Sequence, residues 1–171
     1  MPEVTLRHEF DCDEQTYWDR TTFDQAFNER LYRDILKFPG YELLSLVDDD
    51  DAKTRRVRID PPLGGMPSAV KKAVGDRFSY VEEGRFDKKT RRYTFQILPS
   101  AMRDKAKTFG ELFCEKLGDK RVARIARVTV EVKVFMVGGL VEEKILGDVR
   151  HSYEAAARFT REYLKELGLT A

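Results

Sequence analysis

The chain has little cysteine and histidine, with two residues of each kind among its 171. Cys12 and Cys114 lie far apart in the sequence and match neither a metal-binding spacing nor a disulfide framework, so free thiols are expected. His8 and His151 lie in no recognised catalytic or metal-binding motif. We therefore expect no metal, no cofactor and no catalytic histidine.

The sequence also lacks long uncharged stretches. The two longest, 61–70 and 93–102, have ten residues each, about half the length of a membrane-spanning helix. The first residues lack the basic, apolar and small-residue regions of a secretory signal. These features predict a cytoplasmic protein.

An excess of positive charge is absent as well, because 31 Lys and Arg face 30 Asp and Glu. Nucleic-acid binding is therefore not expected. The basic residues form short clusters, for which we keep two interpretations: solvated turns and strand edges, or transient contact with an anionic membrane surface. The clusters comprise Arg55, Arg56, Arg58, Lys88, Lys89, Arg91, Arg92, Lys120, Arg121, Arg124 and Arg127.

Two motifs that would indicate ligand chemistry are incomplete. An EF-hand loop beginning at Asp48 requires glycine at its sixth position, where Lys53 stands, so the acidic run 48–51 predicts a hairpin turn. The pair Gly64-Gly65 lacks the lysine and hydroxyl residue that end a phosphate-binding loop. Nucleotide and calcium chemistry have no support in the sequence.

Alternating apolar and polar residues predict several β-strands. Residues 4–10 and 128–136 show the clearest alternation. Further strands are predicted at 41–47, at 53–60, in two segments of 76–98 around the turn 87–89, and at 107–117, where the pattern leaves the inward face open.

Helical spacing predicts two further regions. Residues 13–38 carry apolar side chains at helical intervals with a break near 20–22, and a long apolar stripe follows Gly138-Gly139 as far as Leu167. Prolines and glycines surround a short helix at 67–74, so the segment 61–74 is interpreted as a connector or lid. This order of elements predicts an α+β protein whose curved antiparallel sheet wraps around a long C-terminal helix.

Three segments carry a resemblance to a known superfamily: the opening strand 7–10, residues 13–17, and the block 132–142. Gly138, Gly139 and Glu142 match a turn followed by an acidic residue and a long helix. On these residues the chain resembles the START-like, helix-grip superfamily, and in particular its bacterial members related to polyketide cyclases and lipid-transfer domains. The resemblance covers 1–171 as a single START-like domain.

The resemblance implies an apolar cavity between the sheet and the terminal helix, and a core filled by the same aromatic residues is the alternative. The predicted ligand-binding residues are Tyr80, Tyr93, Phe95, Phe109, Phe113, Val130, Val132, Val134, Met136, Val149, Ser152, Tyr153 and Ala156.

The function expected from this cavity is binding or transfer of a hydrophobic small molecule, such as a lipid, a sterol or a polyketide-like compound. No catalytic residue is assigned, because the sequence has no recognisable nucleophile and base. Two alternatives stay open. One is a cyclase or aromatase in which Glu82, Glu111 or Tyr153 moves protons, and the other is a protein-interaction module with a filled core.

Overall fold

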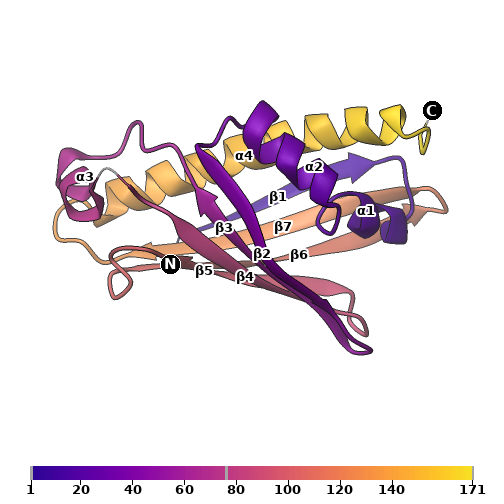
Figure 1. The fold of residues 1–171 in the computed structure, drawn as a ribbon, viewed down its shortest axis with the longest axis horizontal. Coiled ribbons are helices and arrows are strands. Elements are labelled where there is room, and N and C mark those ends of the chain that lie inside the picture. The colour runs from indigo at the N-terminus through magenta and orange to yellow at the C-terminus, as the bar shows by residue number, and fades with distance from the viewer. Residues whose placement is uncertain (1, 76, 171) are drawn as a thin grey trace.

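The computed structural model describes residues 2–75 and 77–170. Seven antiparallel strands form one curved sheet in the order β1-β7-β6-β5-β4-β3-β2, and a long C-terminal helix lies along its concave face (Figure 1). The elements are β1 (Glu3–Phe10), α1 (Glu14–Arg20), α2 (Gln25–Glu29), the π-helical turn η1 (Arg30–Ile35), β2 (Gly40–Asp48), β3 (Ala52–Asp60), α3 (Ser68–Val74), β4 (Tyr80–Asp87), β5 (Arg92–Pro99), β6 (Ala106–Gly118), β7 (Arg121–Val132) and α4 (Gly138–Glu166). The predicted fold class is confirmed.

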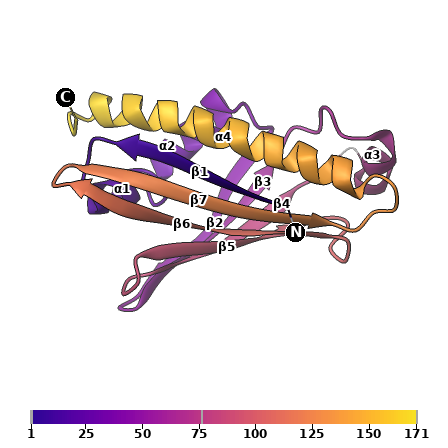
Figure 2. The ribbon, with the colours of Figure 1, turned by 180° about the vertical axis from the view of Figure 1, so that it is seen from behind.

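The first strand pairs with the last one. β1 runs antiparallel to β7 from Glu3 opposite Thr129 to Phe10 opposite Val122, and α4 lies over both strands (Figure 2). The even-numbered side chains of β1 face the core, as the alternation predicts. β1 and β2 are therefore the two edges of the sheet.

The helical region after β1 breaks where the sequence predicts it. Asp13 caps α1 by accepting a hydrogen bond from the backbone N–H of Thr16 at 2.8 Å, and Asp24 caps α2 through Phe27 N–H at 2.9 Å. Between the caps, Thr21 leaves the helical conformation. Two short helices therefore replace one long one.

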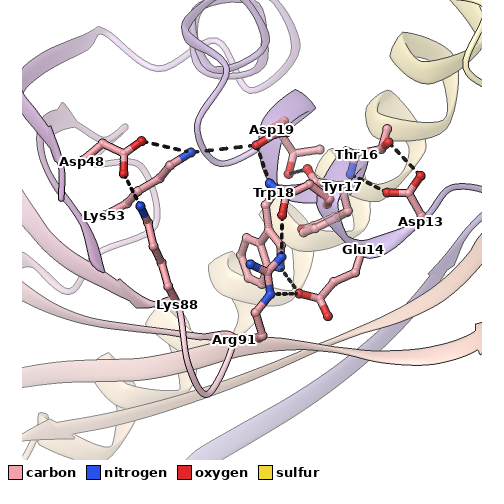
Figure 3. A network of polar contacts seen from close by, with 12 residues as sticks. Asp13, Glu14, Thr16, Tyr17, Trp18, Asp19, Asp48, Lys53, Lys88 and Arg91 are labelled. Carbon is pink, nitrogen blue, oxygen red and sulfur yellow. Dashed lines mark hydrogen bonds and ion pairs between the residues drawn. The ribbon is translucent and has the colours of Figure 1, made fainter. Parts of the chain in front are cut away.

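Polar contacts fix α1 to the turns of two hairpins (Figure 3). The Glu14 carboxylate accepts hydrogen bonds from Trp18 Nε1 at 3.0 Å and from Arg91 Nε, in the β4–β5 turn, at 2.7 Å. Lys53 Nζ at the start of β3 lies 3.8 Å from Asp19. These contacts hold the helix across one end of the concave face.

The strand predicted at 128–136 is wrong at both ends, because β7 spans Arg121–Val132. Its first half contains a buried arginine, Arg124, that interrupts the apolar alternation. Its last pairing partner in β6 is Ala106, opposite Val132, so the chain turns away there. Met136 follows in a left-handed conformation with a φ of 66° and is 86% exposed.

The start of α4 is joined closely to the end of β7. Glu142 accepts a hydrogen bond from Val132 N–H at 2.8 Å. A Cβ at Gly138 would lie 2.5 Å from the carbonyl oxygen of Val132, so only glycine fits there. The helix ends at the predicted cap, where Gly168 has a φ of 71° and Leu169 N–H bonds Leu164. None of the described helices has the length and apolar character needed to cross a membrane.

The remaining elements agree with the predictions made from the sequence. Both predicted hairpins are present, as β2–β3 and β4–β5, and the short helix of the 61–74 segment is α3. The first residue of the predicted region 76–98, Asp76, lies outside the described residues. In β6 the side chain of Leu112 faces the core, whereas Phe109 and Phe113 face outward, which settles the face that the pattern left open.

Candidate functional site

A pocket of about 450 Å³ lies between the concave face of the sheet and α4. Side chains from α2 and η1 line one part of it, and side chains from the segment around α3 line another. Most lining side chains are apolar, including Leu31, Met66, Ile97 and Val128. Apolar side chains of the hydrophobic core, such as Val128, therefore form part of the pocket lining.

Eight of the residues predicted to bind a ligand line this pocket. They are Tyr80, Tyr93, Phe95, Val132, Val149, Ser152, Tyr153 and Ala156. They come from three neighbouring regions, namely the β4–β5 hairpin, the end of β7 and the middle of α4. Their contact with a ligand stays a prediction.

The structure places the other five predicted residues outside the pocket lining. Phe109 and Phe113 lie on the outer face of β6, where Phe113 stacks under the Arg92 guanidinium at 4.1 Å. Val130 is fully buried in the core and does not reach the pocket surface. Val134 and Met136 follow the end of β7, so the strand that was expected to turn them inward is absent there.

The first polar cluster in the pocket wall joins an arginine, a carboxylate and a phenol. The Glu82 carboxylate accepts hydrogen bonds from Arg55 Nη2 and from Tyr93 OH, both at 2.8 Å. Arg55 also donates to the backbone oxygen of Thr22 at 2.8 Å. Burial and the neighbouring Glu82 charge raise the pKa of Tyr93 well above its usual value, so its hydroxyl stays protonated and donates.

A second polar cluster lies where β1, β7, α1 and α4 meet. Arg124 Nη1 donates to Tyr17 OH at 3.1 Å, and Arg124 Nη2 lies 2.9 Å from His8 Nδ1. On the other side of the imidazole, His8 Nε2 lies 3.1 Å from a carboxylate oxygen of Glu154. The Tyr153 ring packs 5.0 Å from the Arg124 guanidinium carbon.

The contacts of His8 fix its protonation. Since a guanidinium only donates, Nδ1 must accept from Arg124, and the ring proton is on Nε2 where it is donated to Glu154. Burial lowers the pKa of His8; the hydrogen bond to Glu154 acts against this shift, and the positive charge of Arg124 adds to it. His8 is therefore a neutral imidazole that links Arg124 to Glu154.

Of the three proton-transfer candidates named from the sequence, two lie at the pocket and one does not. Glu82 and Tyr153 line the pocket, as does His151. Glu111 instead lies on the outer face of β6, where it accepts hydrogen bonds from Arg92 at 3.1 Å and Arg127 at 2.6 Å. Of the three residues named for the cyclase alternative, Glu111 therefore lies away from the pocket.

Both cysteines are free thiols. Burial raises the pKa of Cys12 to about 11 and that of Cys114 to about 12. The thiolate that acts as a nucleophile is therefore scarce at neutral pH.

Sequence reasoning missed Arg55 and Arg124 as parts of the pocket. Both were assigned to surface clusters, but they are 6% and 3% exposed and line the cavity. The strand period carries the signal that identifies them, because Arg55 shares the parity of buried Val57, and Arg124 that of buried Val122.

Comparison with solved structures identifies several with the same fold. A protein of Thermus thermophilus, TTHA0849, is 16% identical with a TM-score of 0.69, covering 97% of this chain and 99% of its own. The Zhui aromatase/cyclase from Streptomyces sp. R1128 is 13% identical with a TM-score of 0.61, covering 96% and 92%. A START superfamily protein from Mycobacterium smegmatis is 16% identical with a TM-score of 0.60, covering 95% and 98%.

These likenesses establish the helix-grip architecture of START-like proteins, which the sequence resemblance predicts. A search of curated proteins gives no match. A family model described as a protein of unknown function, DUF2505, matches residues 5–164. The chain therefore belongs to the DUF2505 family and has the START-like fold.

Proposed function

We propose that the chain binds a hydrophobic small molecule in the pocket between the sheet and α4, for storage or transfer. The observation that carries the proposal is the opening of about 450 Å³ inside the core. Its size is within the range of about 300–1,000 Å³ typical of small-molecule sites. The apolar lining supplies affinity, and a few hydroxyl groups, such as those of Tyr80 and Ser152, supply orientation.

The segment 61–74 is the proposed lid. Leu63, Met66 and Val70 line the pocket from one end, and α3 stands beside the start of α4 (Figure 1). Its only regular element is a helix of seven residues, so few backbone hydrogen bonds hold it closed. A crosslink from this segment to α4 is expected to slow ligand exchange more than it changes stability.

Cyclase or aromatase chemistry in the same pocket is the second candidate. The observation that favours it is the Glu82 carboxylate, which is 14% exposed and accepts hydrogen bonds from Arg55 and Tyr93 in the pocket wall. The structural likeness includes the Zhui aromatase/cyclase and the norcoclaurine synthase of Thalictrum flavum, the latter at 14% identity with a TM-score of 0.60. The third alternative, a filled core with recognition at the surface, has less support because a pocket of about 450 Å³ lies between the sheet and α4.

Transient contact with an anionic membrane is part of the transfer proposal. Phe135 is 91% exposed and Met136 is 86% exposed in the turn before α4, with Lys133 beside them. Exposed apolar side chains next to a cation suit an interface with acidic headgroups. Cosedimentation with phosphatidylserine-containing vesicles, lost in the double variant Phe135→Ser and Met136→Ser, tests this contact.

The experiment that tests the main proposal is native mass spectrometry of gently purified protein, together with organic extraction of whatever accompanies it. A discrete adduct of lipid or polyketide mass is expected. A clean mass of the chain alone, before and after incubation with mixed lipids, would overturn the proposal and leave the surface-recognition alternative.

A further inference from the structure

Two buried arginines line the pocket, and only one has a carboxylate beside it. Arg55 forms an ion pair with Glu82 at 2.8 Å. Among the ion pairs of residues 2–75 and 77–170, none includes Arg124, whose hydrogen bonds go to the neutral groups of Tyr17 and His8. Its Nε–H has no hydrogen-bond partner within that described part of the chain.

Burying a cation without a counter-charge is costly. Arginine keeps its charge at all relevant pH values, so Arg124 cannot avoid this cost by losing a proton. The carboxylate linked to Arg124 through His8, that of Glu154, lies beyond the imidazole, and its side chain is 54% exposed. Its charge is therefore separated from Arg124 by a ring and screened by water.

We infer that Arg124 binds the anionic head of the pocket's ligand, and that the ligand is an amphipathic carboxylic acid. The inference rests on the proposed function, because it requires that the pocket hold an apolar molecule. A carboxylate matches the planar guanidinium, which has N–H donors left after Tyr17 and His8 are bonded. The apolar remainder of the pocket then takes the aliphatic or aromatic part of the acid.

The test compares two probes of equal chain length, decanoate and 1-decanol, by titration calorimetry at pH 7.5. The wild-type chain is expected to bind decanoate at least tenfold more tightly, since a hydrogen bond to a charged group contributes more than one between neutral groups. The variant Arg124→Met is expected to lose this preference and to keep its binding of decanol.

The matched control is Arg127→Met, three residues along β7 on the opposite face. Arg127 bonds Glu111 on the outside of the sheet, so its removal is expected to leave the preference intact. Equal binding of the two probes by the wild type, or a preference that survives in Arg124→Met, would overturn the inference while the pocket proposal stands. Binding of neither probe would overturn the proposed function and the inference with it.

A second measurement avoids the variant in case Arg124→Met does not fold. Decanoate labelled with ¹³C at its carboxyl is titrated by NMR while bound to the wild-type chain. Contact with Arg124 is expected to lower the pKa of the bound carboxyl below that of free decanoate. A raised pKa, as in an apolar site without a cation, would contradict the inference.

Discussion

The ring of Tyr93 lies directly across Gly84, so closely that a Cβ at position 84 would be 1.8 Å from the tyrosine oxygen. Gly84 is in β4, and Tyr93 crosses over it from β5 to reach Glu82. The absence of a side chain at 84 is therefore what allows the phenol to bond the carboxylate.

Gly84→Ala is expected to displace Tyr93 and to lower the free energy of unfolding by about 1–3 kcal/mol, as overpacking in a core does. Urea denaturation measures the loss. In a Tyr93→Ala background the same change should cost much less, because the clash is removed. Gly118→Ala is the control, since a Cβ there has 4.0 Å of room. Additive losses in the double variant would contradict this account.

Glu82→Gln is expected to destabilise the chain strongly, because Arg55 then keeps its buried charge without a partner. Breaking a buried ion pair on one side costs about 3–5 kcal/mol. The control is Glu83→Gln on the opposite face of β4, which breaks the exposed pair with Arg56 and should cost less than about 1 kcal/mol. Thermal unfolding of the two variants measures the loss of stability in each. Equal losses would contradict the claim that burial makes the Arg55–Glu82 pair more important for stability than the exposed pair.

The lowered pKa of His8 predicts a pH dependence of stability with a definite sign. Below the usual pKa of about 6.5, the unfolded chain takes up a proton at His8 that the folded chain resists. The free energy of unfolding should therefore fall as pH drops through 6.5 towards the folded-state pKa, by at most about 1.4 kcal/mol per pH unit. The charged groups around His8 are Arg124 and Arg161, which lower its pKa, and Glu154, which raises it.

Urea denaturation at several pH values between 7.5 and 5 measures this slope. The variant His8→Gln should lack the His8 contribution in that window. The lowered pKa of Glu154 acts at more acidic pH, so its contribution is separable. If the free energy of unfolding of His8→Gln falls with pH as steeply as that of the wild type, groups other than His8 cause the pH dependence.

The hydrogen bond from Val132 N–H to Glu142 predicts a structural role for the acidic residue after the glycine turn. Glu142→Ala leaves the last strand N–H of β7 without this partner and is expected to cost about 1 kcal/mol. The neighbouring Glu143 is exposed, so Glu143→Ala serves as the control. Hydrogen exchange at the Val132 amide should accelerate in Glu142→Ala and not in Glu143→Ala. Unchanged exchange in Glu142→Ala would contradict a structural role for Glu142.

Local sequence patterns were sufficient for most of the fold. Strict alternation marks β1, and the capping aspartates with a break between them mark α1 and α2, because these signals depend only on neighbouring residues. The limits of β7 depend on where its partner strands end and on a charged residue inside the core. Neither is a local property of the sequence.

The site was less accessible to the same reasoning. Tyr93 was chosen for its position in an alternating strand and Tyr153 for a hydroxyl that could orient a ligand, and both side chains line the pocket. Arg124 was missed because charge favours the surface unless a partner is present, and its partners come from β1 and α1, far away in the sequence. The sequence did not decide which face of β6 is turned towards the core, since both faces of this strand hold apolar side chains.

The pairing of β1 with β7 also has a consequence for how the chain is made. His8 contacts an arginine that is 116 positions later in the sequence, so β1 has no sheet partner until the other six strands of this sheet have been synthesised. Pairing across such a separation is intrinsically slow. The cluster of His8, Tyr17 and Arg124 is completed only when β1 pairs with β7, and a nascent chain that ends before β7 contains an unpaired β1 and lacks Arg124.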